Sequence, residues 1–320
     1  MPAATPSVSF DDIVAARDRI AQYVLRTPLV RLNVDAPNEI WLKLENLQPI
    51  GSFKLRGALN RMLSASSEDL EEGVLTASAG NMAQGVAWGS KRLGVPCSVV
   101  VPDHAPAAKV DAIERLGGRV SRVPFNDWWQ ILVDHQAPGH SGMFIHPVSD
   151  PFVVAGNGTI GLEIAEDLPA VDSVIVPYGG GGLSSGIATA LQTAIPSARV
   201  YAAEVDTASP FAASLDAGTP TPFDYVPSFV DGIGGRTVLA EMWPLTSALL
   251  AGSKVVSLGK VAEAIRLLVA RNRVVAEGAG AASVAAALAS EETEKTIVCI
   301  VSGGNIDPLK LATILSGDIP

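Results

Sequence analysis

Several common features are scarce or missing in this 320-residue chain. It has only two cysteines, Cys97 and Cys299, and each lies in an apolar, strand-like run. That placement indicates reduced core thiols in a cytosolic protein rather than a disulfide or a metal site. No run of about 18 apolar residues predicts a membrane span, and the first residues lack the basic start and apolar core of a signal peptide. The net charge of −10 argues against a surface for nucleic acid or for an anionic membrane. We therefore expect a cytoplasmic protein whose partner is a small molecule.

Apolar runs alternate with amphipathic segments along most of the chain. Apolar strands between amphipathic helices predict parallel sheets that are covered by helices on both faces. The strands spread over too many residues for one small sheet, so we predict an α/β protein with two open, twisted, mostly parallel domains. The predicted strands are residues 41–45, 74–78, 98–102, 119–124, 143–147, 173–178, 200–205, 253–258 and 297–302.

The predicted domains are unequal in size. Residues 74–147 are expected to form the smaller domain, and residues 1–73 and 148–320 the larger one. Residues 206–252 are rich in proline, with Pro210, Pro220, Pro222 and Pro227 among them, and are expected to form long surface loops. Ser52 is a candidate N-cap for a helix that runs to about Met62. The other predicted helices are residues 10–22, 81–93, 106–116, 126–135, 159–167, 183–194, 260–271 and 281–289.

Four consecutive glycines, Gly179 to Gly182, lie between a predicted strand and a predicted helix. Without any Cβ atoms, the backbone N–H groups of such a turn can converge on an anion at the start of the helix, where the helix dipole also favours negative charge. A tight turn alone needs one or two glycines. The cluster therefore predicts a cup for a phosphate group.

Other motifs at this position fit less well. The dinucleotide fingerprint G-x-G-x-x-G is not matched, and no G-x-x-x-x-G-K-[ST] occurs in the chain. A G-x-S-x-G is present around Ser184, as in a hydrolase nucleophile elbow, but that enzyme class needs a histidine after the serine. All four histidines precede Ser184. A small phosphorylated ligand or cofactor is favoured, and a lysine elsewhere in the chain would complete a site for pyridoxal phosphate.

Six motifs then occur together in one order, and through them the chain resembles the fold-type-II pyridoxal-phosphate enzymes. Within that family it is similar to the branch of serine/threonine dehydratases and serine racemase, over nearly its whole length. The resemblance implies the fold of the tryptophan synthase β-subunit, with an active site between a larger and a smaller, mobile domain, and a homodimer. The motifs are GSFKLRGA (51–58), TASAGNMAQGVA (76–87), GNGTIGLEI (156–164), PYGGGGLSSGIA (177–188), AEGAGAAS (276–283) and VSGGNID (301–307).

The resemblance implies a role for particular positions. Lys54 matches the Schiff-base lysine, and Phe53 matches the residue that packs on the cofactor ring. Asn81 matches the asparagine near the ring hydroxyl, and Ser302 the partner of the pyridine nitrogen. The other matches are Gly179, Gly180, Gly181, Gly182 and Leu183 for the phosphate, and Ser78, Ala79, Gly80, Asn81 and Met82 for the loop that receives the substrate carboxylate.

These roles imply an ammonia-lyase. A serine at the pyridine nitrogen cannot stabilise a protonated ring as a carboxylate would, which disfavours transamination and favours loss of a β-substituent. We expect dehydration and deamination of a 3-hydroxy amino acid to a 2-oxo acid and ammonia, with Lys54 as the base at the α-carbon. Threonine, serine and a bulkier or acidic 3-hydroxy amino acid all remain open as substrates.

A racemase or a β-replacement enzyme on the same fold is the alternative. Serine racemase carries a second serine, which acts as acid and base, where this chain has Ala79. Elimination is therefore predicted over racemisation. A non-catalytic carrier of the cofactor is disfavoured, because storage would need only the lysine and the phosphate cup.

Three departures from the family pattern bear on the site. Met82 replaces a histidine, either as an apolar gap-filler or as part of a reshaped substrate pocket. The metal site of racemase-like members would use Glu204 and an acid at the position of Pro210; Asp206 lies nearby, but we predict no metal. Trp128 and the next residue, Trp129, are expected to pack in the core of the smaller domain.

Overall fold

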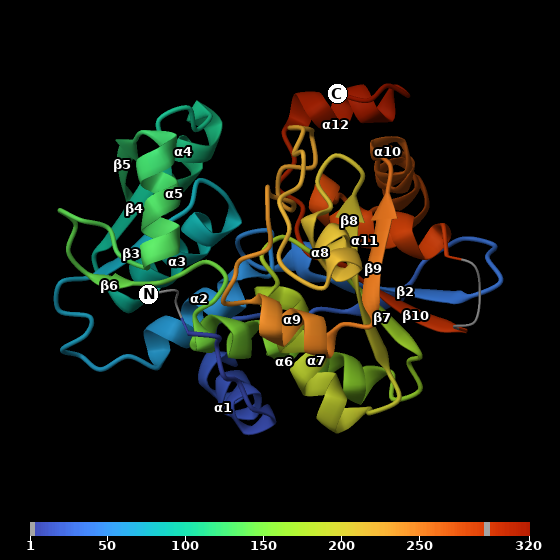
Figure 1. Ribbon diagram of the computed structural model, residues 1–320, viewed down its shortest axis with the longest axis horizontal. Helices are drawn as coiled ribbons and strands as arrows, with labels where there is room; N and C mark the ends of the chain where they lie inside the picture. Colours follow the sequence, from blue (N-terminus) through green and yellow to red (C-terminus); the bar gives the residue numbers. More distant parts are fainter. Residues whose placement is uncertain (1–3, 291–294) are drawn as a thin grey trace.

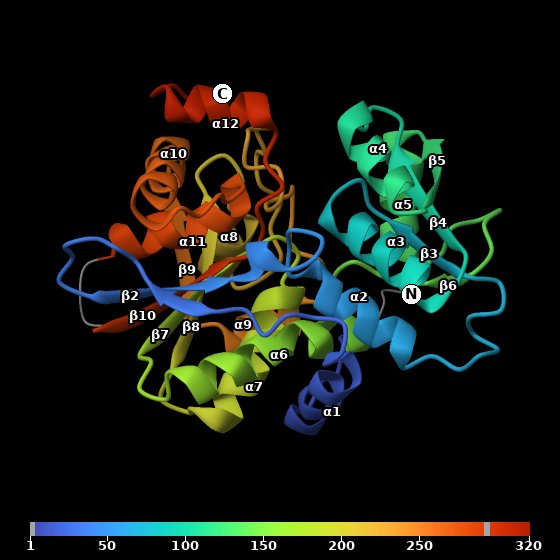
Figure 2. The ribbon, with the colours of Figure 1, turned by 180° about the vertical axis from the view of Figure 1, so that it is seen from behind.

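The computed structural model describes residues 4–290 and 295–320. These residues form two β-sheets, each flanked by helices (Figures 1 and 2). Residues 1–3, which the predicted larger domain includes, lie outside the described part. None of the helices described is both long enough and apolar enough to cross a membrane.

The larger sheet has six strands in the order β1-β2-β10-β7-β8-β9. All neighbouring strands are parallel except the edge pair β1 and β2. β10 is central, and its alternate side chains lie in two different cores: Ile297 and Cys299 in one, Val298 and Ile300 in the other. A strand buried on both faces is apolar along its buried length, as residues 297–301 (IVCIV) are. The bounds are β1 Leu29–Arg31, β2 Glu39–Leu44, β7 Ser173–Pro177, β8 Arg199–Val205, β9 Gly252–Val256 and β10 Thr296–Val301.

Helices cover both faces of this sheet. α6 and α7 lie on one face with α1 and α9, and α10 and α11 cover the other, with α12 outside α10 (Figures 1 and 2). The bounds are α1 Phe10–Ile20, α6 Pro151–Asp167, α7 Gly182–Ala194, α8 Pro210–Ala217, α9 Trp243–Leu249, α10 Leu258–Leu267, α11 Gly278–Leu288 and α12 Pro308–Leu315.

The smaller sheet has four parallel strands in the order β5-β4-β3-β6. α5 packs on one face of it, while α3 and α4 pack on the other. α2 lies between the two sheets and contacts both α3 and α6. The bounds are α2 Lys54–Leu63, β3 Val74–Ala77, α3 Asn81–Leu93, β4 Cys97–Pro102, α4 Ala107–Arg115, β5 Arg119–Val123, α5 Phe125–Asp134 and β6 Met143–Phe144. All four strands fall within residues 74–147; that this block is a separate, mobile domain stays a prediction.

Some elements differ from the sequence-based expectation. β6 is shorter than predicted, because the chain leaves the sheet at His146 and Pro147, and a proline has no N–H for the ladder. α6 begins earlier than residue 159, since the Asp150 side chain accepts from the backbone N–H groups of Phe152 and Val153 and caps a longer helix. Within residues 206–252, α8 and α9 form with proline in the first turn, where its missing N–H costs nothing.

Candidate active site

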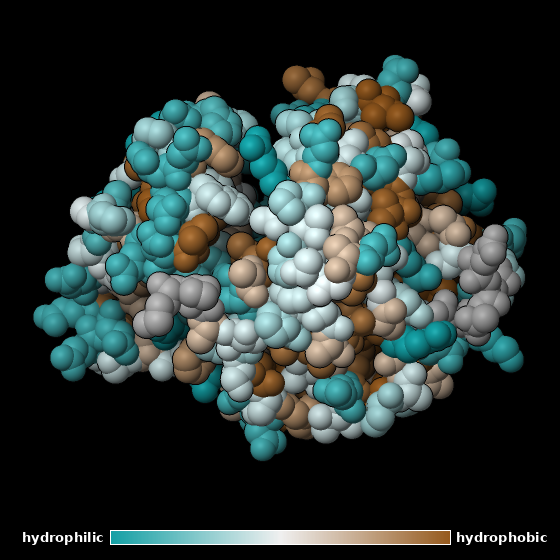
Figure 3. Space-filling model, in the orientation of Figure 1, coloured by the Kyte–Doolittle hydropathy of each residue, from teal (hydrophilic) through white to brown (hydrophobic). Residues whose placement is uncertain are grey.

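A cavity of about 490 Å³ lies between the two sheets. The space-filling view shows a notch between the part that carries α4 and α5 and the part that carries α12 (Figure 3). Every residue that the sequence predicted for the site lines this one cavity: Phe53, Lys54, Ser78, Ala79, Gly80, Asn81, Met82, Gly179, Gly180, Gly181, Gly182, Leu183 and Ser302. Positions up to 250 residues apart in the chain are thus brought together, although their individual roles stay predictions.

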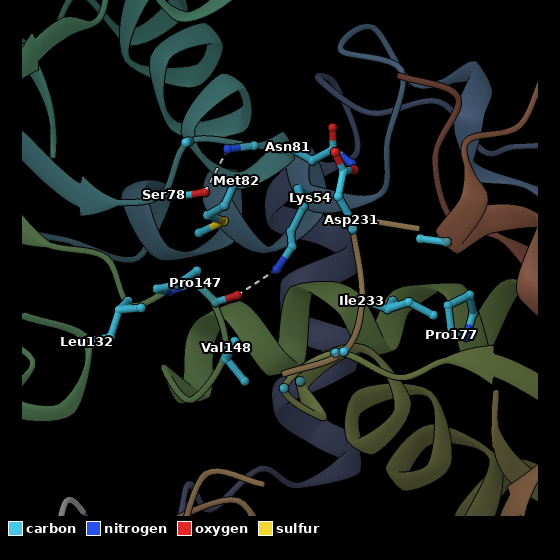
Figure 4. A pocket seen from close by; sticks show the side chains of 18 of the residues that line it. Lys54, Ser78, Asn81, Met82, Leu132, Pro147, Val148, Pro177, Asp231 and Ile233 are labelled. Atoms are coloured by element: carbon cyan, nitrogen blue, oxygen red, sulfur yellow. Dashed lines mark hydrogen bonds between the residues drawn. The ribbon is translucent and has the colours of Figure 1, made fainter. Parts of the chain in front are cut away.

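Lys54 is the first residue of α2, and its side chain points into the cavity (Figure 4). Its Nζ donates to the carbonyl oxygen of Pro147 at 2.7 Å and lies 5.2 Å from the ring centroid of Phe53. Burial penalises the charged form and lowers the pKa of Lys54 to about 8. The side chain is therefore an amine that can lose its proton near neutral pH.

The segment before Lys54 is fixed to the large sheet. Ser52 does not cap α2 as expected; Phe53 occupies the N-cap position, and Ser52 instead forms a bridge with Gly303. The N–H of Phe53 donates to the carbonyl oxygen of Ser302 at 3.0 Å. The helix start is thus held at the end of β10, beside the other cavity residues.

A buried cluster of charges holds the next turn of α2. Arg56 pairs with Glu45 at 2.8 Å and with Glu163 at 2.6 Å, and Lys43 also pairs with Glu163 at 2.6 Å. All four side chains are buried. Because each buried charge has a partner, the cluster anchors the helix that carries Lys54 to β2 and α6.

Glycines in two of the motifs allow α2 and α6 to pack closely. A Cβ on Gly57 would lie 2.8 Å from the carbonyl oxygen of Val153, and one on Gly156 would lie 2.6 Å from the carbonyl oxygen of Arg56. Neither position has room for a side chain. These glycines therefore serve the packing that places Lys54.

The glycine loop connects β7 to α7 and forms another side of the cavity. Gly181 has φ +95°, and a Cβ there would meet Thr246 at 2.6 Å; a Cβ on Gly182 would lie 2.5 Å from the carbonyl oxygen of Val148. α7 begins at Gly182, so its free N–H groups and the positive end of its dipole face the cavity. This cradle fits a phosphate group. The hydroxyl of Ser184 is buried and donates to the carbonyl oxygen of Gly181 at 3.0 Å, which does not suit an exposed nucleophile.

The predicted carboxylate loop follows β3 and leads into α3. Gly80 is the N-cap of α3, and its N–H donates to Oγ of Ser78 at 3.2 Å (Figure 4). Asn81 is the first residue of the helix, and Met82 is buried. A helix start that faces a cavity is suited to bind an anion such as a carboxylate.

Glu277 was not singled out from the sequence, although it lies within the AEGAGAAS motif. Its carboxylate accepts from Nδ2 of Asn81 at 2.8 Å, while Oδ1 of Asn81 accepts from Nδ2 of Asn305 at 2.8 Å. Burial, together with the charge of Asp231, raises the pKa of Glu277 to about 7. Both ends of the Asn81 amide are thereby fixed. The sequence around Glu277 does not predict this contact, because Asn81 and Asn305 come from two other segments of the chain.

The wall formed by α5 was also missed. Phe125, Trp128 and Leu132 line the cavity, so Trp128 is not only a core residue as predicted; Trp129 is absent from the lining and packs against the core of the small sheet. One signal was available in the sequence. Residues just after parallel strands meet at one edge of a sheet, and α5 begins two residues after β5 ends.

Two groups bear on the question of a metal. Both carboxylate oxygens of Glu204 already accept hydrogen bonds, from the N–H groups of Phe211 and Ala212 and from the hydroxyl of Ser253. Asp206 is exposed in the turn that follows β8. The Glu204 carboxylate thus holds the start of α8 and Ser253 of β9.

Within the described ranges, His135, His146 and Glu241 have a spacing that could suit an ion. The two imidazole rings are stacked at 4.2 Å and 8°, so one ion could not lie in the plane of both. Nδ1 of His146 accepts from the N–H groups of Val148 and Ser149, and burial lowers the pKa of His146 to about 3. This group is a hydrogen-bonded stack that shapes the loop beside Pro147; the absence of a bound metal stays a prediction.

The sequence of the chain is similar to a known protein family and to characterised enzymes. A family model described as "Pyridoxal-phosphate dependent enzyme" matches residues 20–303. An L-threonine ammonia-lyase of Thermotoga maritima is 38% identical over 306 residues, which are 94% of this chain and 76% of that protein.

Solved structures of similar enzymes also superimpose on the chain. Maize serine racemase superimposes with a TM-score of 0.89 at 31% identity and covers 97% of each chain. The processed form of threonine deaminase isoform 2 from Solanum lycopersicum has a TM-score of 0.88 at 32% identity, over 98% of this chain and 90% of that one.

Proposed function

The chain belongs to the pyridoxal-phosphate dependent enzymes, and on this premise we propose that it eliminates water from a 3-hydroxy amino acid and, by a later hydrolysis that takes up one water, releases a 2-oxo acid and ammonia. The observation that carries the proposal is the placement of the half-buried Lys54 amine in one cavity with the glycine cradle and the Ser78–Met82 loop. A lyase named for threonine is among the relatives that resemble the chain over most of its length.

The cavity residues fit the cofactor as follows. The glycine loop and the start of α7 would hold the phosphate, Phe53 would pack on the ring, and Ser302 and Asn81 would meet its nitrogen and its hydroxyl. Bound there, pyridoxal phosphate supplies an electron-withdrawing ring joined to the substrate nitrogen, which acidifies the hydrogen on the α-carbon.

Lys54 would then move the proton. Because burial lowers its pKa to about 8, a useful fraction of the amine is neutral near pH 7 and can accept the α-hydrogen. The carbonyl oxygen of Pro147 orients Nζ. The 3-hydroxyl leaves as water, and a second water molecule later replaces the nitrogen, so the products are a 2-oxo acid and ammonia.

Ala79 bears on the racemase alternative. Racemisation needs a second group that returns a proton to the opposite face of the α-carbon, and an alanine at this point of the loop has none to give. We therefore favour elimination, although maize serine racemase is similar in structure.

A substrate screen tests the proposal. L- and D-3-hydroxy amino acids are incubated with the holoenzyme, without an added nucleophile, and release of 2-oxo acid is measured. We expect release from at least one L-substrate, and none with Lys54→Ala. Activity that survives in Lys54→Ala, or interconversion of serine enantiomers as fast as 2-oxo acid release, contradicts the mechanism.

We also propose that the enzyme acts as a homodimer in the cytoplasm and that residues 74–147 move as one domain. Light scattering during gel filtration would give twice the 33.1 kDa mass of the chain. A mass that stays at one chain at micromolar concentration would contradict the dimer.

A further inference from the structure

We propose that the substrate carries a large apolar group on its 3-carbon, and that a phenyl ring or a branched chain of similar size fits best. The inference rests on the proposed function, because it names which 3-hydroxy amino acids the cavity admits. The cavity wall on the side of the small sheet supports this inference.

Aromatic rings form one part of this wall. Phe125 and Trp128 are both on α5, with ring centroids 5.8 Å apart, and the ring of His104 lies 5.7 Å from that of Phe125. All three line the cavity. These spacings are those of interacting aromatic pairs, and such a ladder binds a further ring well.

Sheet geometry puts the ladder beside the reacting carbon. Ser78, His104 and Phe125 follow the ends of the parallel strands β3, β4 and β5, so they lie along one edge of the small sheet. A substrate whose carboxylate meets the loop at Ser78 and whose α-carbon lies near Lys54 therefore has its side chain next to this edge.

Three apolar side chains line the cavity near these rings. Met82 and Leu132 are buried, and both line the cavity together with Val148. Figure 4 shows Leu132 and Val148 around Pro147, whose carbonyl oxygen holds Nζ of Lys54. Methionine adapts its shape to an apolar ligand, which explains why Met82 suits this position better than a polar residue would.

An acidic side chain meets no free lysine or arginine among the described residues of this wall. Of the lysines and arginines among the described lining residues, Lys54 has a chemical task and Lys109 is paired with Asp231 at 3.0 Å. The same cavity is also lined by two acids, Asp231 and Glu277. The cavity therefore disfavours acidic 3-hydroxy amino acids.

Turnover by the holoenzyme tests the inference. The values of kcat/KM are compared for L-threonine, L-threo-3-phenylserine and L-threo-3-hydroxyaspartate. We expect phenylserine to exceed threonine by about tenfold or more, as one aromatic contact can provide, and hydroxyaspartate to be poorest. Equal or faster turnover of threonine or hydroxyaspartate overturns the inference.

Adjacent tryptophans on α5 give a matched pair of variants. Trp128→Ala should lower kcat/KM for phenylserine about tenfold more than for threonine, whereas Trp129→Ala should leave the ratio of the two substrates as in the wild type. The ratio is unaffected by the amount of folded enzyme, so partial unfolding does not mimic the result. An equal change of the ratio in both variants, or no change in either, overturns the inference.

A binding measurement separates this inference from the proposed function. L-phenylalanine, L-alanine and L-aspartate lack the 3-hydroxyl, and their affinity for the holoenzyme is measured by calorimetry. We expect phenylalanine to bind about tenfold tighter than alanine. If no 3-hydroxy amino acid reacts, the proposed function fails while this preference still stands; if phenylalanine binds no better than alanine or aspartate, the inference fails whatever the activity.

Discussion

At the scale of single residues, the protonation state of the Glu277 carboxyl links the pH to the stability of the site. This carboxyl fixes the amide of Asn81, and burial raises its pKa to about 7 from the ordinary 4.5. The folded protein thus holds this proton more tightly than the unfolded chain does. The stabilisation from this group is fully present below about pH 4.5 and is lost as the pH rises through about 7.

Substitution of Glu277 by glutamine tests this linkage. In Glu277→Gln the amide oxygen can still accept from Asn81, but nothing titrates. Between pH 5 and pH 8 the free energy of unfolding of the cofactor-free wild type should fall relative to that of the variant, by up to about 3 kcal/mol. Urea unfolding at several pH values measures it. Parallel pH profiles for the two proteins would show that the carboxyl does not titrate in this range.

At the scale of elements, the join between β7 and α7 makes a prediction about cofactor affinity. A methyl group on Gly182 would lie 2.5 Å from the carbonyl oxygen of Val148, whereas one on Gly179 would have nothing nearer than 3.6 Å. Gly182→Ala must therefore displace the loop, and we expect its dissociation constant for pyridoxal phosphate to rise at least about tenfold, and by more than that of Gly179→Ala. Cofactor absorbance during titration measures both constants; the reverse order would contradict the cradle.

The anchoring of α2 gives a prediction about stability. Removing Arg56 leaves Glu45 buried without its cationic partner and weakens the charge balance at Glu163. We expect Arg56→Ala to cost about 3–5 kcal/mol in the free energy of unfolding. The control is Lys260→Ala, which breaks an exposed pair with Glu263 and should cost much less than Arg56→Ala. Comparable losses in the two variants would mean that the buried cluster does not anchor the helix.

At the scale of the whole molecule, the ion pair of Lys109 and Asp231 links the two parts across the cavity. Lys109 is on α4 beside the small sheet, and Asp231 is in the loop that follows α8 in the large part; Nζ and Oδ2 are 3.0 Å apart. Both side chains are partly exposed, so the pair contributes at most about 1 kcal/mol and is weakened by salt.

Asp231→Asn tests whether this pair assists closure over the substrate. We expect KM to rise by up to about fivefold, and the difference from the wild type to shrink in high salt. The negative charge of Asp231 also raises the pKa of Glu277, so the titration of Glu277 should shift to lower pH in the variant. Glu263→Gln, which removes an exposed charge far from the cavity lining, is the control; an equal change there would point to net charge instead.

The sequence by itself determined the class of sheet, the glycine cradle and the position of Lys54. Each of these features depends on a short stretch of sequence. Apolar runs indicate buried parallel strands, four consecutive glycines allow an open turn, and the GSFKLRGA motif identifies the lysine. The elements that were missed or cut short, such as the edge strand β1 and the short β6, depend on pairing with distant segments and carry little local signal.

Only the tertiary structure decided what surrounds those residues. Glu277 and Asp231 reach the cavity because strand order and helix packing bring their segments to one place, and no spacing along the chain records that. The same holds for the lowered pKa of Lys54, which follows from burial rather than from its sequence neighbours. Short motifs in the sequence thus identify the cofactor-binding residues. The shape and charge of the cavity wall, in contrast, arise from contacts between segments far apart in sequence.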